Sequence, residues 1–428
     1  MKTTYMIVIA VVVIAIIIGS VFAYTYMSSN ASKQASSPTP TPTAAPTAAP
    51  TAKPTAAPTA GPTAAPTPTP APTPVPTISP ATQLNGAGGT LVQPLMADWQ
   101  IAYNQYQPKV QVNYNAVGSG AGITAFQGQT VDFGESDMPL QAADIAGLPT
   151  GTTALTIPIS ASAVVPAYNL KLVNGSMCPD GLIFNGTVLA NIFLGTITTW
   201  NDLSLQQLNP TLAAQLPSTA ITVIHRSDGS GTMFAFTDYL SQASTAWANG
   251  PGKSKLPNWP VGLGAKGNAG VAQDIELYTG SIGPLEIAYA LQNPSLISYG
   301  AVVNAAGNAI LANVSNMQLS LAAGATNLPA GNGVWSNVSI IDNIFNDKTD
   351  TGIYPIVTLT YALVYESQTS FNQGAALVSF LTWVINQGQA YATKEGYAPL
   401  PANIVAIDTT TISQITYQST GAQIPLLN

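Results

Sequence analysis

The stretch that decides the fold is Val110-Gln111-Val112-Asn113-Tyr114-Asn115-Ala116-Val117, which runs directly into Gly118-Ser119-Gly120-Ala121-Gly122. Apolar and polar residues alternate in the first part, as they do in a β-strand, and the second part is a glycine-rich loop. Residues 221–226 repeat this plan, followed by Asp228-Gly229-Ser230-Gly231-Thr232 and a predicted helix over residues 233–241. Strand, loop and helix in this order predict an α/β fold with a largely parallel sheet.

The two units lie far apart in the sequence, so we expect two lobes. Apolar, strand-like segments at residues 156–168 and 354–365 separate regions of differing pattern, and we expect them to cross between the lobes and form the hinge. The first lobe is predicted to comprise residues 83–160 and 355–428, and the second lobe residues 161–354. A helical pattern at residues 375–386 is expected to pack back onto the first lobe.

The N-terminal region predicts where the protein resides. Residues 1–27 read as a membrane anchor or signal segment, because the chain from Tyr5 to Tyr24 is almost wholly apolar and uncharged, about the 20 residues that span a bilayer as a helix. An uncleaved anchor fits this length better than a cleaved signal peptide, which stays the alternative. Residues 28–82 are rich in Pro, Thr and Ala and predict an extended polyproline II stalk. We therefore expect a membrane-anchored, extracytoplasmic body at the cell surface.

Composition limits the classes of function. Only 7% of the residues are charged, 11 basic against 18 acidic, so the chain lacks the basic surface that binds nucleic acid. Cys178 is the single cysteine, which excludes an intrachain disulfide and a cysteine-based metal site. The sequence has no cluster of His and Asp at metal-ligand spacing and no dinucleotide fingerprint. We expect neither a metal nor a cofactor.

Three glycine-rich segments predict an anion site: residues 86–90, 118–122 and 228–232. Each is read as a loop that feeds a helix, where glycine lets the backbone approach a ligand and the first amides of the helix carry partial positive charge. Hydroxyl groups add further donors, and Gly231 offers its backbone. The same hydroxyls could cap the helices, a role compatible with ligand binding. The hydroxyl donors are Thr90, Ser119, Ser230 and Thr232.

One cation and one carboxylate complete the predicted site. Arg226 stands at a strand end, two residues before the third glycine segment, where it can make bidentate bonds to an oxyanion while Asp228 pairs with it. Asp137 is the predicted acceptor, because an ionised carboxylate repels an anion unless that anion donates a proton to it. Phosphate can donate such a proton and fully ionised sulfate cannot. Asp132 and Glu135 are expected to be solvated or structural, with the alternative that one of them is the acceptor.

The sequence offers no constellation for catalysis. It has no Gly-x-Ser-x-Gly elbow with a downstream histidine partner and no Walker-type loop. His225 is the only histidine, and we expect it to be structural. We therefore predict that the protein is not an enzyme.

These motifs resemble those of the phosphate-specific substrate-binding proteins (PstS) of ABC transporters. The similarity extends from about Leu84 to Pro401 and leaves out the predicted anchor and stalk. It rests on the three glycine segments, on Arg226, and on the further runs Val131-Asp132-Phe133-Gly134 with Ser136-Asp137, Gly262-Leu263-Gly264-Ala265-Lys266-Gly267-Asn268, and Ser281-Ile282-Gly283 before Glu286.

The resemblance implies a periplasmic-binding-protein-like fold of type II. Two α/β lobes, each a mixed sheet flanked by helices, would be joined by two hinge crossings and close around one phosphate. Leu91 and Gly120 depart from the family pattern, which commonly has an aromatic residue and a second serine there. Leu91 would still bind through its backbone amide. The implied phosphate contacts are Thr90, Leu91, Ser119, Asp137, Arg226, Ser230, Gly231 and Thr232, supported by Asp228, Gly89, Gly118 and Gly120.

The function implied is that of a high-affinity receptor that binds inorganic phosphate outside the cytoplasm and delivers it to an ABC permease with a cytoplasmic ATPase. Three alternatives stay open. The site could bind another tetrahedral oxyanion such as molybdate or arsenate, or it could belong to a phosphatase-like phosphoryl hydrolase built on the same loops. The stalk alone would also suit a cell-surface adhesive or sensory module.

Overall fold

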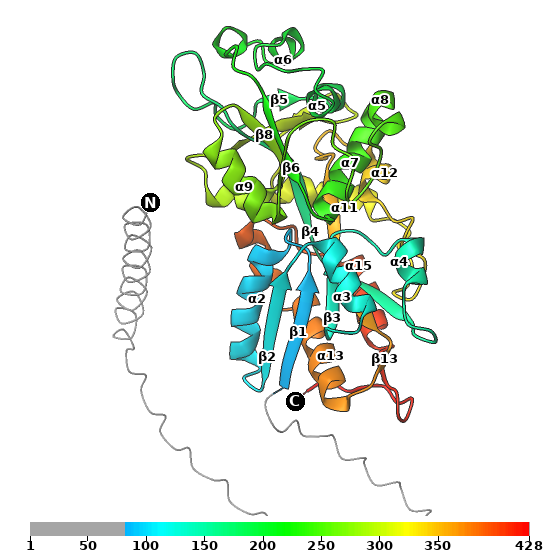
Figure 1. Ribbon diagram of the computed structural model, residues 1–428. Helices are drawn as coiled ribbons and strands as arrows, with labels where there is room; N and C mark the ends of the chain where they lie inside the picture. Colours follow the sequence, from blue (N-terminus) through cyan, green and yellow to red (C-terminus); the bar gives the residue numbers. More distant parts are fainter. Residues whose placement is uncertain (1–81, 428) are drawn as a thin grey trace, which may run out of the picture. The chain divides into compact units, whose positions relative to one another are not determined.

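The computed structural model describes residues 82–427 (Figure 1). The predicted anchor, residues 1–27, lies outside the described residues, and so does the predicted stalk, residues 28–82, apart from Thr82. Within residues 82–427, no helix has the length and apolar character needed to cross a bilayer.

One large mixed sheet organises the described residues. Strand β1 pairs in parallel with β2 and β3, whereas β12 runs antiparallel to both β3 and β4. The short strand β9 (Ser298–Tyr299) also pairs with β4. The strands lie in the order β2 (Val110–Ala116), β1 (Thr82–Gly88), β3 (Phe133–Ser136), β12 (Val357–Tyr365), β4 (Ala154–Asn169), β8 (Ser281–Glu286), β6 (Thr222–Arg226) and β7 (Leu263–Ala265).

Strand β4 connects the two ends of this sheet. Its residues 154–163 pair with β12, and its residues 164–169 pair with β8. We call β1, β2, β3 and β12 with their helices the first half, and β6, β7 and β8 with their helices the second half. The predicted crossing at residues 156–168 lies within β4, and the one predicted at residues 354–365 overlaps β12. That these strands form a hinge stays a prediction. The exact lobe boundaries stay predictions.

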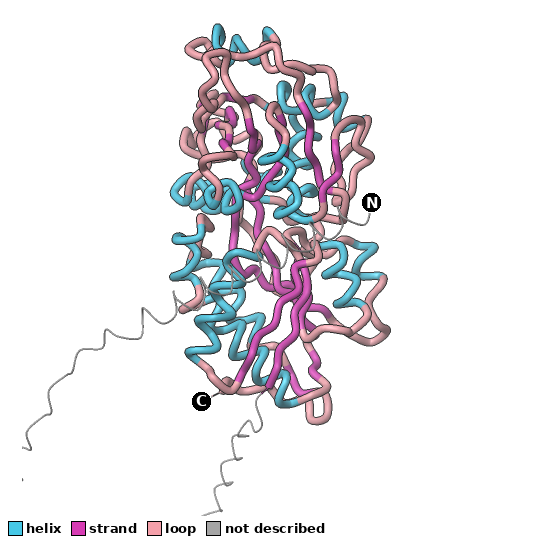
Figure 2. Tube along the Cα trace, turned by 60° about the vertical axis from the view of Figure 1, so that its left-hand side comes forward, coloured by secondary structure: helices cyan, strands magenta, loops and turns pink. Residues whose placement is uncertain are grey.

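Helices flank the strands of the first half (Figure 2). Trp99 is buried under them, and its indole Nε1 donates to the carbonyl of Gly388 at 2.8 Å, which ties the C-terminal region to α2. Helix α13 packs against β1 and α2, as the sequence predicted for this region. The helices are α2 (Gln93–Tyr106), α3 (Ser119–Gln127), α4 (Ala142–Ala146), α13 (Phe371–Ile385), α14 (Gln389–Ala392) and α15 (Ala402–Ile412).

The second half has its own aromatic core and helices. Phe193 and Phe236 meet edge to face with ring centroids 4.9 Å apart, which joins α5 to α7. Cys178 is buried as a free thiol. The helices are α5 (Gly186–Phe193), α6 (Leu203–Leu208), α7 (Gly231–Ala243), α8 (Thr245–Asn249), α9 (Gly267–Leu277), α10 (Ile287–Gln292), α11 (Val314–Gly324) and α12 (Ile340–Ile344).

Small sheets complete the architecture. Strands β11 (Ala309–Ile310), β10 (Ala301–Val303) and β5 (Ile183–Phe184) form one, and β13 (Ser367–Gln368) pairs with β14 (Thr416–Tyr417) in another. The protein therefore has the predicted α/β class: a mixed, curled sheet with flanking helices.

Candidate functional site

The loops that follow β1, β2, β3 and β6 meet where the two halves join (Figure 1). Gly120 at the start of α3 donates its N–H to the carbonyl of Gly229 at 2.9 Å, which is a contact between the halves. Gly231, the first residue of α7, donates its N–H to Ser119 Oγ at 3.1 Å. These contacts bring the second and third predicted glycine segments together.

Ser119 holds Asp137 in this junction. Its Oγ donates to Asp137 Oδ2 at 3.0 Å and accepts the backbone N–H of Asp137 at 3.1 Å. Asp137 is 1% exposed, and its other carboxylate oxygen, Oδ1, is buried without a hydrogen-bond partner among residues 82–427. A buried acceptor without a donor is costly, so this oxygen points to a ligand that carries a hydrogen.

Arg226 is equally buried, at 1% exposure, and ends β6. Its Nε and Nη2 donate to the two oxygens of Asp228 at 2.7 and 2.5 Å, as the sequence predicted. Burial raises the pKa of Asp228, but the hydrogen bonds and charge of Arg226 outweigh burial and hold that pKa below its ordinary value. Nη1 of Arg226 has no partner in the described part of the chain. The guanidinium is thus fixed in place with one donor nitrogen unused.

The electrostatics of the two groups are linked. Burial raises the pKa of Asp137 to about 6, while the Ser119 hydroxyl and the positive charge of Arg226 act in the opposite direction. Ser119 and Arg226 thus favour the ionised form of Asp137 against the effect of burial. An ionised acceptor and a cationic donor in one buried site suit a ligand that is an anion and still bears a proton.

The predicted hydroxyls line the same junction. Ser230 caps α7, because its Oγ accepts the N–H of Met233 at 3.3 Å, so the capping role foreseen from the sequence is real here. Thr232 is buried in the first turn of α7. Thr90, from the loop after β1, accepts the backbone N–H of Asn268 at 2.9 Å, which is a third contact between the halves.

Glycine is required where the backbone segments approach one another. An ideal Cβ on Gly89 would lie 2.6 Å from Asp137 Oδ1, and one on Gly231 would lie 2.5 Å from Asp137 Cβ. Gly118 has a φ of +94°, which glycine adopts without strain, and packs against Asp228. Side chains at these positions would push the loops apart.

The first glycine segment corrects one prediction. Residues 86–88 belong to β1 and not to a loop, since β1 pairs with β2 on one side and β3 on the other. A Cβ on Gly86 would overlap the ring of Phe133, so this glycine serves strand packing. The loop begins only at Gly89. Leu91 is buried, and its carbonyl accepts the hydroxyl of Tyr397 at 2.6 Å.

Glu135 is a buried group whose site role the sequence left open. Its Oε2 accepts the N–H of Gly89 and, at 2.7 Å, the hydroxyl of Tyr114, while Oε1 contacts the hydroxyl of Thr360. Burial, followed by the negative charge of Asp137, raises the pKa of Glu135 well above its ordinary value. Glu135 thus has a structural role: Oε2 positions the Gly89 loop, and Oε1 contacts Thr360 on β12.

Two further side chains were assigned no role from the sequence. Glu286 is buried with Oε1 accepting from Ser162 Oγ at 2.6 Å, and burial raises its pKa to about 8. Asn268 touches two of the predicted hydroxyls. Both residues lie in runs that the family resemblance had marked, which was the only signal for them. His225 stacks on Trp259 with centroids 4.7 Å apart, in agreement with a structural role.

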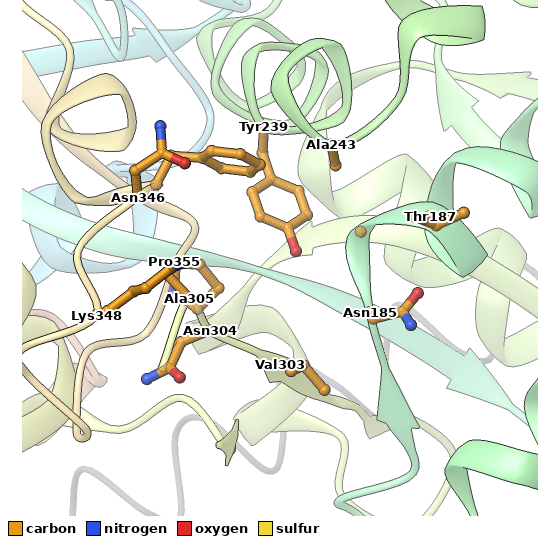
Figure 3. Close-up of a pocket in the computed structure, with 12 residues that line it drawn as sticks. Asn185, Thr187, Tyr239, Ala243, Val303, Asn304, Ala305, Asn346, Lys348 and Pro355 are labelled. Atoms are coloured by element: carbon orange, nitrogen blue, oxygen red, sulfur yellow. The ribbon is translucent and has the colours of Figure 1, made fainter. Parts of the chain in front are cut away.

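A separate pocket in the second half has a volume of about 330 Å³ (Figure 3). Asn185, Tyr239, Asn304, Lys348 and Pro355 are among the residues that line it. None of the predicted anion-binding residues lines this pocket, so it is distinct from the junction site.

Comparison with known proteins matches the chain at two levels. A family model described as a PBP superfamily domain matches residues 57–387. The phosphate-binding protein PstS of Xylella fastidiosa is 36% identical over 325 residues, which is 76% of this chain and 83% of that protein. The phosphate-binding protein PstS of Methanocaldococcus jannaschii is 31% identical over 339 residues, 77% of this chain and 85% of that protein.

Solved structures share the fold. The phosphate-binding protein from Stenotrophomonas maltophilia has a TM-score of 0.60 at 17% identity, and the match covers 81% of this chain and all of that one, 100%. A putative phosphate ABC transporter substrate-binding protein from Clostridium perfringens, solved with bound phosphate, has a TM-score of 0.52 at 17% identity, covering 75% and 100% of the two chains. At these identities the likeness concerns the fold alone.

Proposed function

We propose, because the chain belongs to the PstS family of phosphate-binding proteins, that its junction site binds inorganic phosphate and that the protein delivers this phosphate to an ABC permease. The observation that carries the proposal is a pair of buried atoms that have no hydrogen-bond partner within residues 82–427, Asp137 Oδ1 and Arg226 Nη1. Asp137 Oδ1 needs a hydrogen-bond donor and Arg226 Nη1 needs an acceptor, and a phosphate that bears a proton supplies both.

The remaining contacts are proposed from the same geometry. Neutral donors surround an anion without adding charge, and in a site closed to water each hydrogen bond is stronger than at the surface. Asp228 orients the guanidinium, while Gly89, Gly118 and Gly120 permit the close approach of the loops. The proposed ligand contacts are Thr90, Leu91, Ser119, Asp137, Arg226, Ser230, Gly231 and Thr232. Ser119 would act through its backbone N–H, because its hydroxyl hydrogen is donated to Asp137.

Selectivity follows from Asp137. Phosphate retains at least one proton at neutral pH, and that proton can be donated to Asp137 Oδ1. Sulfate has no proton to donate, so its oxygen would face a carboxylate oxygen across a dry contact. An unpaired buried charge of this kind costs several kcal/mol, which corresponds to about 100-fold or more in affinity.

We propose binding and release without a chemical step, at an extracytoplasmic site held to the membrane through the N-terminal segment. The partners would be the membrane subunits of the permease and their cytoplasmic ATPase. Asparagines of three Asn-x-Ser sequons, Asn174, Asn313 and Asn337, are exposed, which suits a body outside the cytoplasm. Opening and closing of the two halves would signal to the permease whether phosphate is bound in the junction site.

The test is a calorimetric titration of the purified protein, freed of bound anion by unfolding and refolding, with phosphate and with sulfate at pH 7.5. We expect one phosphate per chain and sulfate binding about 100-fold weaker or undetectable. Equal affinities would contradict the proposal. Competition with arsenate and molybdate tests the other oxyanions, and steady release of phosphate from a phosphomonoester would instead favour a hydrolase.

A further inference from the structure

Asn268 joins the two halves beneath the proposed phosphate site. It is the second residue of α9 and is 0% exposed. Its side-chain Nδ2 lies 3.1 Å from Thr90 Oγ1 and 3.2 Å from Thr232 Oγ1. Thr90 belongs to the first half and Thr232 to the second, so one amide group contacts a hydroxyl from each.

The orientation of this amide is set by its third neighbour. Asn268 Oδ1 lies 3.4 Å from the backbone N–H of Glu286 and accepts from it. A peptide N–H can only donate, so the amide oxygen must face Glu286 and the amide nitrogen must face the two hydroxyls. Nδ2 is therefore the donor in both contacts with threonine.

These contacts determine which hydrogen bonds the hydroxyls of Thr90 and Thr232 can still make. A hydroxyl oxygen has two lone pairs and one hydrogen. Thr90 Oγ1 accepts from both Asn268 N, at 2.9 Å, and Asn268 Nδ2, so its two acceptor positions are filled. Its only remaining capacity is to donate. Thr232 Oγ1 also accepts from Nδ2, which leaves its hydrogen directed elsewhere.

From this geometry we infer that Asn268 is a positioning residue of the phosphate site. It fills both acceptor positions of Thr90 Oγ1, which makes that hydroxyl a donor to the anion, and it occupies one acceptor position of Thr232 Oγ1, which turns the hydroxyl hydrogen of Thr232 away from the amide and toward the anion. The inference rests on the proposed function. Hydroxyls that are already oriented lose less freedom when they bind, which raises affinity without any direct contact between Asn268 and the ligand.

The same contact couples donor orientation to closure. The N–H of Asn268 is among the first amides of α9, which have no partner within their own helix. Thr90 Oγ1 supplies that partner from the opposite half. Separation of the halves would break this contact, so Thr90 becomes a full donor only when the site is closed.

The first test replaces Asn268 with aspartate, which keeps the shape of the side chain, removes both donor hydrogens and adds a negative charge. The Thr90 and Thr232 hydroxyls would then donate to the new carboxylate and not to phosphate. We expect the full-length Asn268→Asp protein to bind phosphate at least about 100-fold more weakly by calorimetry. The double-mutant cycle described below, which adds no charge, separates the loss of the donors from repulsion between this charge and the anion.

The matched control is Asn209→Asp. Asn209 is 3% exposed, and its Nδ2 donates to the carbonyls of Ile183 and Leu205, both at 2.9 Å, away from the site. Asn209→Asp makes the same replacement of an amide by a carboxylate. We therefore expect this variant to have a lower melting temperature but a phosphate affinity within about threefold of that of the unmodified protein. Equal losses of affinity in both variants would overturn the inference.

A double-mutant cycle keeps the inference testable if the aspartate variant fails to fold. Asn268→Ala and Thr232→Val are measured singly and together. If Asn268 acts through the hydroxyl, the valine substitution costs much less affinity in the Asn268→Ala background than alone, by at least about threefold. Additive effects would mean that Asn268 is merely structural. Failure of the unmodified protein to bind phosphate would instead reject the proposed function and the inference together.

Discussion

Gly231→Ala tests whether the junction site must close to bind its ligand. Gly231 is the first residue of α7 and has an ordinary helical backbone, so alanine is locally favourable there. Its added Cβ, however, would lie 2.5 Å from Asp137 Cβ, 2.6 Å from Asp137 C and 2.8 Å from Asp137 Cα. Two of these three atoms are backbone, so no side-chain rotation relieves the overlap.

The overlap lies between the halves, and separating them is the simplest relief. The Cβ must move about 0.9 Å to reach the 3.4 Å at which ordinary contact begins. The same movement lengthens the 3.1 Å hydrogen bond from Gly231 N–H to Ser119 Oγ to roughly 4 Å, where it is lost. Hydrogen bonds to a charged ligand contribute about 1.5–3 kcal/mol each, so the loss of one weakens phosphate binding by about 10- to 150-fold and the loss of two by up to about 20,000-fold.

The assay combines calorimetry with small-angle scattering of the full-length protein. We expect Gly231→Ala to keep its melting temperature within a few degrees, to bind phosphate weakly, and to show no compaction on addition of phosphate. Gly128→Ala is the control, because a Cβ there meets its nearest neighbour, Thr124 O, at an ordinary 3.4 Å. Phosphate affinity of Gly231→Ala within about twofold of the unmodified protein would refute the reasoning.

Three further substitutions test other parts of the account. Asp137→Asn removes the acceptor charge, so the ratio of phosphate to sulfate affinity should fall about tenfold or more, measured by competition calorimetry. Arg226→Lys loses the two-point contact with Asp228 and should weaken phosphate binding about 100-fold; an unchanged affinity would show that the guanidinium geometry is unimportant. Asp408 is buried on α15 with both oxygens unpartnered among the described residues, and burial raises its pKa from 3.8 to about 9. The folded state keeps a proton that the unfolded chain releases above pH 3.8, so stability is lost as pH rises toward 9. Urea unfolding at pH 4 and pH 7 should show that the unmodified protein loses on the order of 4 kcal/mol more than Asp408→Asn does, and identical pH profiles of the two proteins would contradict it.

The sequence predicted those features that depend on local pattern. Alternation at residues 110–116 predicted β2, and the order of strand, glycine loop and helix predicted that Ser119 and Ser230 would open helices near one another. In the structure β6 runs opposite to β1, β2 and β3, so the carboxyl ends of the strands of the two halves face one another across the junction. Residues more than 100 positions apart could be assigned to one site from the shared anion-loop chemistry of the glycine segments and from the family resemblance.

Features that depend on distant partners could not be predicted. Asn268 is an ordinary residue for the start of a helix, so nothing local marks it. Its role depends on Thr90, which lies 178 residues away in the sequence. Glu135 reads as a charged residue in a short strand, yet it is buried because Gly89, Tyr114 and Thr360 supply its hydrogen bonds. Such burial follows from the assembled loops and not from any periodicity.

The central claim is that the buried carboxylate of Asp137 accepts a hydrogen bond from the proton of a bound phosphate and thereby selects phosphate over sulfate. A crystal structure of the phosphate complex at neutral pH tests it most directly. We predict a phosphate oxygen about 2.5–2.7 Å from Asp137 Oδ1, the length of a charge-assisted hydrogen bond, with another within hydrogen-bond reach of Arg226 Nη1. Phosphate bound elsewhere, or bound here with the carboxylate of Asp137 turned away from it, would contradict the account.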